Sequence, residues 1–277
     1  MRPRIVLLLA GREVRTAVRA RWFVVGALAF ALLAVAVASL GMAGASRWGI
    51  SALDRTSAAL LNLVLLFVPL LTLPLGAASF SGEAEEGTLP YLVAQPVTRG
   101  EVFLGKLFGL QCATTLSLLL GFGAAAIWIG AHGAVESRAF LALAGGAALL
   151  GVVTTTLGVL LSIAARTRAR SLAAAVGAWL LLVFLCDFGV LALAAAQTLG
   201  PNALFAVALA NPLQSAKTLC ALAISERLEI LGPAGIHAVH ALGRGLLAAV
   251  LAGELALVTA LGGGGAFLLF KKQELAA

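Results

Sequence analysis

The 277-residue sequence contains few charged residues and few cysteines. Only 11% of its residues are charged, whereas a soluble domain carries about 25%. In addition, 61% are hydrophobic, which is more apolar surface than one core of this size can bury. A soluble protein and a disordered chain are therefore excluded. Three cysteines are too few for a disulfide scaffold, and the 31 glycines follow no collagen-like period. A polytopic membrane protein remains.

The sequence also lacks the residue combinations of an enzyme. It has no cysteine pair and no serine with a matching base and acid. Residues Gly100–Lys106 fit the phosphate-binding pattern G-x-x-x-x-G-K, but Leu107 follows where Ser or Thr must reach magnesium, and no strand precedes the segment. We interpret them as helix glycines and a lysine at the membrane interface. The chain itself is therefore expected to bind no cofactor.

Six apolar stretches are long enough to cross a bilayer as helices, because about 20 residues are needed. Each is apolar on every face, which argues against the alternating strands of a membrane barrel. The predicted fold class is therefore all-α, with six transmembrane helices. The predicted spans are residues 22–40, 58–80, 107–130, 140–165, 172–196 and 246–270.

The basic residues give these spans an orientation. With the N-terminus inside, thirteen of the 19 lysines and arginines face the cytoplasm, as the positive-inside rule requires. Both termini are then cytoplasmic. The net charge of +7 follows from membrane topology and contact with anionic lipid, so no nucleic acid partner is expected. The thirteen are Arg2, Arg4, Arg12, Arg15, Arg19, Arg21, Arg99, Lys106, Arg166, Arg168, Arg170, Lys271 and Lys272.

Residues 1–21 precede the predicted six-span domain of residues 22–277. Their apolar run is too short for a signal peptide. In a helix, Arg12, Arg15 and Arg19 would share one face, with Ala10 and Ala17 on the other. The segment is therefore predicted to lie as a helix in the inner membrane interface. The alternative is a set of charges that only fixes topology.

The inner loop, residues 81–106, contains an acidic cluster and a short apolar stretch. Thr88 has the position of a helix cap, which predicts a surface helix over Leu89–Ala94 that stops before Pro96. Thr98 and Glu101 have the spacing of a capping box at the start of the next helix. Such a surface helix suits the docking of a partner protein. A solvated loop whose acids offset nearby arginines is an equal alternative.

This loop resembles that of the type-2 ABC exporter permeases. The resemblance covers the six-span plan and almost the whole chain. Softer similarities, among them Cys186-Asp187-Phe188 and Asn211-Pro212, point within that family to permeases of the nitrous-oxide-reductase maturation system. The matching loop residues are Glu83, Glu85, Glu86, Gly87, Thr88, Leu89, Leu92, Pro96, Val97, Arg99, Gly105 and Lys106.

The resemblance implies an N-terminal elbow helix and a coupling helix that rests in a groove of a separate ATPase. It therefore implies that Glu83, Glu85, Glu86, Gly87, Thr88, Leu89, Leu92, Pro96 and Arg99 form the ATPase-coupling site. It also implies re-entrant outer helices, which agrees with two short apolar stretches, Ala203–Ala210 and Leu219–Ile224, in the outer loop of residues 197–244.

Two acids, Asp187 and Glu254, lie at membrane depth in the predicted spans, where a charge costs about 2.5–3.5 kcal/mol. They are candidates for a transport pathway or an outer vestibule, although each could also be neutral and bonded to the backbone. His237 and His240 are weaker candidates for a metal site. A soft-metal path needs several methionines or cysteines, and the sequence has two and three. We therefore assign no metal site.

The sequence thus predicts a permease subunit in a bacterial inner membrane. The expected partners are two ATPase subunits, a second copy of the chain, a periplasmic accessory protein and the lipid bilayer. The work done would be transport or mechanical signalling for the maturation of a periplasmic copper enzyme. Two alternatives remain open: an exporter of a lipid, drug or peptide, and a non-transporting scaffold that recruits a periplasmic partner.

Overall fold

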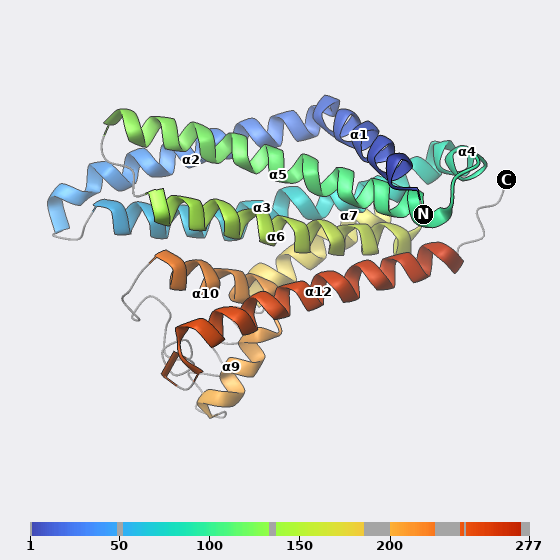
Figure 1. Cartoon of the computed structure of the whole chain (residues 1–277). Coiled ribbons are helices and arrows are strands. Elements are labelled where there is room, and N and C mark those ends of the chain that lie inside the picture. The colour runs from blue at the N-terminus through green and yellow to red at the C-terminus, as the bar shows by residue number, and fades with distance from the viewer. Residues whose placement is uncertain are drawn as a thin grey trace.

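A computed structural model describes residues 2–48, 52–132, 137–185, 200–224, 239–240 and 242–272. Every regular element in these ranges is a helix, so the all-α fold class is confirmed for this part of the chain. Figure 1 shows long helices running side by side, with α1 and α4 at one end and α9 and α10 toward the other.

The chain begins with helix α1 (Pro3–Arg19), followed by α2 (Arg21–Trp48). Arg2 has an extended backbone, and Pro3 occupies the first turn, where its missing N–H costs nothing. The axes of α1 and of Val24–Leu40 differ by 69°. This bend lays α1 across the start of α5 (Figure 1).

Two of the longest helices, α3 (Ala52–Glu85) and α5 (Arg99–His132), are joined by the short helix α4 (Thr88–Val93). Gly87, at a φ of 72°, supplies the left-handed turn between α3 and α4. Helices α6 (Ser137–Ala165) and α7 (Arg168–Leu180) follow, and a π-helical segment, η1 (Leu181–Leu185), continues α7.

The remaining described helices are α9 (Pro201–Leu209), α10 (Pro212–Ile224) and α12 (Arg244–Lys272). Helix α10 packs against α6 and α12. The Asn211 side chain stabilises the start of α10 and connects it to η1. Its Oδ1 accepts the Leu213 N–H at 3.0 Å, and its Nδ2 donates to the Leu182 carbonyl at 2.8 Å. The two short apolar stretches predicted in this loop, residues 203–210 and 219–224, thus correspond to helices α9 and α10, and α10 begins seven residues before the second stretch.

Helices α3 and α6 pack closely against each other. Gly76 and Gly158 face each other, and a Cβ on either would collide with the backbone of the opposite helix. Next to this contact, the Thr72 and Thr154 hydroxyls lie 2.6 Å apart in a buried hydrogen bond. Small residues at such crossings let apolar helices approach closely in a bilayer.

Four described helices are long and apolar enough to cross a membrane, and a fifth candidate exists if the bent pair α1–α2 counts as one span. The four are α3, α5, α6 and α12, which correspond to the predicted spans 58–80, 107–130, 140–165 and 246–270. The predicted span 172–196 is described only as far as Leu185. Four of the six predicted spans are therefore supported as single helices, whereas the predicted span 22–40 is counted only together with α1, and the span 172–196 is described only in part.

Candidate functional site

Chain segments that are distant in the sequence meet at the α4 end of the bundle. Helices α1, α4, α5 and α7 begin here, and α3, α6 and α12 end here (Figure 1). The buried rings of Phe80, Phe103 and Phe270 form the core of this end, with centroids 5.3–6.2 Å apart. The end is therefore a packed junction of helices rather than a loose loop.

A buried lysine connects three of these helices. Lys106 on α5 is only 2% exposed. Its Nζ lies 3.1 Å from both carboxylate oxygens of Glu13 on α1 and 3.0 Å from Glu83 Oε1 on α3. Arg12 adds a longer contact of 3.8 Å to Glu83. Two carboxylates thus share one ammonium group, which ties α1 and α3 to α5.

Two glycines of α5 make the Lys106 contacts possible. Gly105 lies against Leu9 and the Val6 carbonyl of α1, and Gly109 lies against Ala10 and Glu13. A Cβ at either glycine would collide with α1. Because the two glycines are four residues apart, they lie on one face of α5, and α1 packs closely against that face. Burial raises the pKa of the Glu13 carboxyl above its ordinary value, and the Lys106 charge opposes that shift.

Glu101 connects the first turns of α1 and α5. Its Oε2 accepts the Thr98 N–H at 2.9 Å, and the Glu101 N–H donates to the Thr98 hydroxyl at 3.2 Å. The predicted capping box is therefore confirmed. Its other oxygen, Oε1, accepts the Arg2 N–H at 2.7 Å. One carboxylate thus serves the N-terminal ends of two helices, where a negative charge is favourable.

The other acids of the cluster contact the start of α7. Glu85 Oε1 accepts the Arg168 N–H at 2.9 Å, and Glu86 lies 3.7 Å from the Arg168 guanidinium. Both acids are exposed, whereas Glu83 is half-buried. The cluster therefore has two parts, an inner acid bound to Lys106 and an outer pair beside Arg168.

Helix α4 is anchored on one side and exposed on the other. Leu89 and Leu92 are buried, and Leu89 packs into the Phe80 and Phe103 cluster. Tyr91, the only tyrosine of the chain, is 72% exposed. Aromatic side chains are enriched at protein–protein interfaces, so the exposed Tyr91 is a candidate contact for a partner protein.

Residues 7–275 match the family described as ABC-2 family transporter protein. The chain belongs to the ABC-2 transporter family. It is similar to the probable ABC transporter permease protein NosY of Pseudomonas aeruginosa, with 35% identity over 194 residues, covering 68% of this chain and 70% of the relative. The protein of the same description from Stutzerimonas stutzeri is 34% identical over 190 residues, covering 67% and 69%. This chain is thus an ABC-2 permease.

The structure brings the predicted coupling residues of this permease together at the α4 end. Pro96 accepts a 3.4 Å bond at its carbonyl from Arg2, and Arg99 donates to the Phe270 and Lys271 carbonyls at 3.3 and 3.0 Å. These contacts fix the connection from α4 to α5 against α1 and α12. The leucines of the predicted set face inward, so only part of that set is available to a partner.

The predicted start of α4 is wrong by one residue. Thr88 does not cap α4 but begins it, and its hydroxyl donates to the Glu83 carbonyl at 3.3 Å, so the helix lies one residue earlier than predicted. Lys106, which the sequence only indicated as a lysine at the membrane interface, is buried within the protein, where Glu13 and Glu83 balance its charge.

Glu13 and Tyr91 are the site residues that sequence reasoning missed. Glu13 is an acid on the face of α1 that carries Ala10 and Ala17, and that position could have indicated a buried cation nearby. Tyr91 has no such periodic signal, because α4 is only six residues long.

At the other end of the permease, the candidate pathway residues are only partly described. Glu254 on α12 is half-buried, and its Oε2 atom is buried without a hydrogen-bond partner among the described residues. The Ser215 hydroxyl of α10 is buried and faces the Glu254 carboxyl. His240 is exposed, while Asp187 and His237 lie outside the described residues.

Proposed function

We propose that this ABC-2 permease couples ATP hydrolysis by a separate ATPase subunit to work across a bacterial inner membrane. The chain crosses the membrane six times with both termini in the cytoplasm, and it functions as a homodimer with two ATPases. The gathering of basic residues from α1, α5, α7 and α12 at the α4 end supports this orientation. ATP and magnesium bind to the ATPase, and this chain holds no cofactor.

The observation that carries the proposal is the two-sided character of α4. Its buried leucines transmit force to the bundle, while Tyr91, Glu85 and Glu86 remain accessible to a partner. A solvated loop that only balanced charge would not need a buried apolar face. The α4 surface is therefore the docking site of the ATPase.

The path from α4 to the membrane helices follows from the contacts. A displacement of α4 moves the end of α3, because Leu89 and Phe80 belong to one apolar cluster. The end of α3 carries Glu83, which shares Lys106 with Glu13 of α1. Motion of α4 therefore reaches α1, and α1 leads directly into α2.

The docking site is tested by co-purification with the cognate ATPase. Tyr91→Ala and the double substitution Glu85→Lys, Glu86→Lys should lose the ATPase without loss of membrane insertion. Tyr91→Phe is the matched control, because it keeps the aromatic surface, and it should retain the ATPase. The docking assignment is wrong if the alanine and lysine variants still co-purify with an ATPase that turns over normally.

We further propose that the work serves the maturation of a periplasmic copper enzyme, together with a periplasmic accessory protein. The resemblance of the sequence to permeases of the nitrous-oxide-reductase maturation system supports this role. In a host that contains such an enzyme, deletion of the permease gene should leave the polypeptide in the periplasm without its copper. Normal copper loading after deletion would instead favour an exporter of a lipid, drug or peptide.

A further inference from the structure

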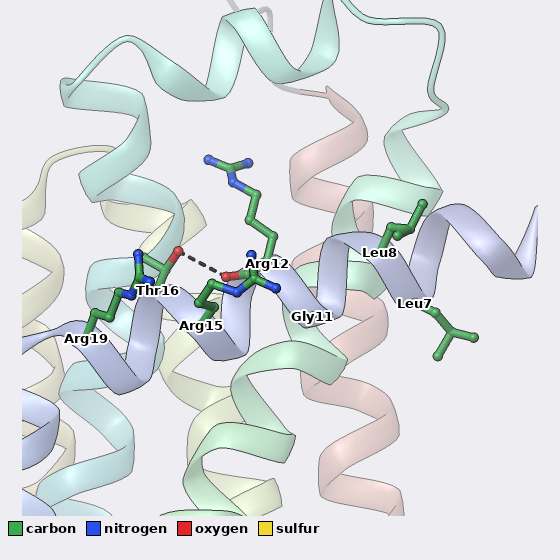
Figure 2. A pocket seen from close by; sticks show the side chains of 7 residues that line it. All are labelled: Leu7, Leu8, Gly11, Arg12, Arg15, Thr16 and Arg19. Carbon is green, nitrogen blue, oxygen red and sulfur yellow. Dashed lines mark hydrogen bonds between the residues drawn. The ribbon is translucent and has the colours of Figure 1, made fainter.

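Helix α1 has an open hollow on the face that points away from α5. Gly11 forms its floor, Leu7 and Leu8 border one end, and Arg12, Arg15 and Arg19 follow along the helix (Figure 2). Its volume is about 330 Å³, comparable to small-ligand sites of about 300–1,000 Å³. A Cβ at Gly11 would meet no other atom, so a larger side chain at this position would project into the hollow.

The charges of the arginines in this hollow are only weakly balanced by carboxylates of the described residues. Arg12 contacts Glu83 at 3.8 Å, which is a long ion pair. Arg15 and Arg19 are exposed and form no ion pair with a carboxylate of the described residues. Both guanidinium groups are therefore accessible to an anion from outside the chain. Guanidinium groups bind phosphate oxygens through parallel N–H bonds, so a phosphate is the best match.

The apolar border indicates what kind of phosphate this is. Leu7 and Leu8 are 71% and 74% exposed, and they lie about one turn from Arg12 and about two turns from Arg15 along the same helix. Leucines beside arginines on one helix are typical of the boundary between lipid headgroups and acyl chains. A free phosphate would gain nothing from the leucines, whereas a phospholipid would cover them.

We propose that the hollow, defined by Leu7, Leu8, Gly11, Arg12, Arg15 and Arg19, binds the headgroup of an anionic phospholipid of the inner leaflet. The phosphate lies against Arg15 and Arg19, above Gly11, and the acyl chains cover the leucines. The site depends on the proposed position of α1 at the inner membrane surface. Because Arg12 also contacts Glu83, a bound lipid holds α1 next to the coupling residues.

The test uses the full-length permease, purified in a neutral detergent, and a fluorescent phosphatidylglycerol as probe. Arg15→Gln should weaken its binding about fivefold, the effect of one arginine near an anionic surface. Gly11→Leu should cause a loss of similar size although no charge changes, because the leucine fills the hollow. This variant should fold, since the position is open and leucine favours a helix more than glycine does.

Two controls separate this site from diffuse attraction. Arg4→Gln removes an exposed arginine of the same helix outside the hollow and should weaken binding much less. Fluorescent phosphatidylcholine should bind weakly to all variants. Equal losses for Arg4→Gln and Arg15→Gln, or unchanged binding by Gly11→Leu, would overturn the proposal.

Other outcomes identify a different ligand. Full competition by inorganic phosphate at the phospholipid's own concentration would mean a free-phosphate site. Loss of the ATPase from Arg15→Gln without a change in lipid binding would assign the hollow to protein docking. The lipid assay contains no ATPase, so its failure leaves the α4 docking site untouched, and failure of that docking site leaves the lipid result untouched.

Discussion

Replacing Lys106 with methionine is the most direct test of how α1 is held. Methionine keeps the length of the aliphatic stem and removes the ammonium group that lies 3.1 Å from Glu13 and 3.0 Å from Glu83. The two carboxylates would then face each other without a cation between them. Lys106 also lies 5.2 Å from the centre of the Phe80 ring, a smaller favourable contact that is lost with it.

The expected cost follows from the burial of the network. At an effective dielectric constant of about 20, each contact at 3 Å is worth roughly 5 kcal/mol of Coulomb attraction. Desolvation of the charges and repulsion between Glu13 and Glu83 cancel much of this attraction. Removal of one partner from a buried ion pair costs about 3–5 kcal/mol. Opening of α1 away from α5 should become easier by that amount.

Hydrogen exchange of the α1 backbone amides in the purified permease measures this change. A loss of 3–5 kcal/mol predicts exchange that is about two to four orders of magnitude faster. Amides around the Gly76–Gly158 crossing of α3 and α6 should be much less affected, because these glycines pack against each other rather than against Lys106. Lys272→Met is the matched control, since it removes an exposed lysine at the same end of the bundle.

A neutral version of the network distinguishes charge balance from packing. Glu13→Gln and Glu83→Gln, combined with Lys106→Met, remove all three charges and should restore most of the protection of α1. Unchanged exchange in Lys106→Met alone would show that the packing of α1 against Gly105 and Gly109 holds the helix in place without the charged network. Failure of the neutral triple variant to recover would refute the argument from unpaired charge.

Three further predictions concern helix packing and capping, and the midpoint of thermal unfolding measures each. Gly158→Ala places a Cβ against the backbone of α3 and should cost about 1–3 kcal/mol. Gly145→Ala on the same helix points into open space and should be neutral to slightly stabilising, because alanine favours a helix more than glycine does; equal effects would contradict the close crossing. Thr98→Ala should cost about 1 kcal/mol as a lost helix cap, and no change would show that the capping box is unimportant. Thr72→Val removes the bond to Thr154 and should cost about 0.6 kcal/mol, so a loss of several kcal/mol would mean that the hydroxyl has a further role.

The helices of this permease are predictable from the sequence because the responsible signals are local. Long apolar runs produce α3, α5, α6 and α12 whatever surrounds them. The capping box at Thr98 and Glu101 needs only a spacing of three residues. In α1, the spacing of the arginines correctly places Arg12, Arg15 and Arg19 on an exposed face.

The contacts between helices are not predictable in the same way. Lys106 and Glu13 are 93 residues apart, and they meet only because α1 bends from α2 and crosses α5 at Gly105 and Gly109. Nothing local distinguishes Lys106 from a lysine that marks a membrane boundary. The start of α4 is unpredictable for a related reason. The Thr88 hydroxyl donates to the Glu83 carbonyl at the end of α3 rather than capping its own helix.

The position of α1 has a consequence for the order in which the protein assembles. Its contacts at Glu101, Gly105, Lys106 and Gly109 all belong to α5, which the ribosome makes roughly a hundred residues later. During synthesis, α1 therefore has no docking surface of its own until α3 and α4 have emerged and α5 is in the bilayer. Although made early, α1 is fixed late, and its docking marks the point at which the first half of the bundle is complete.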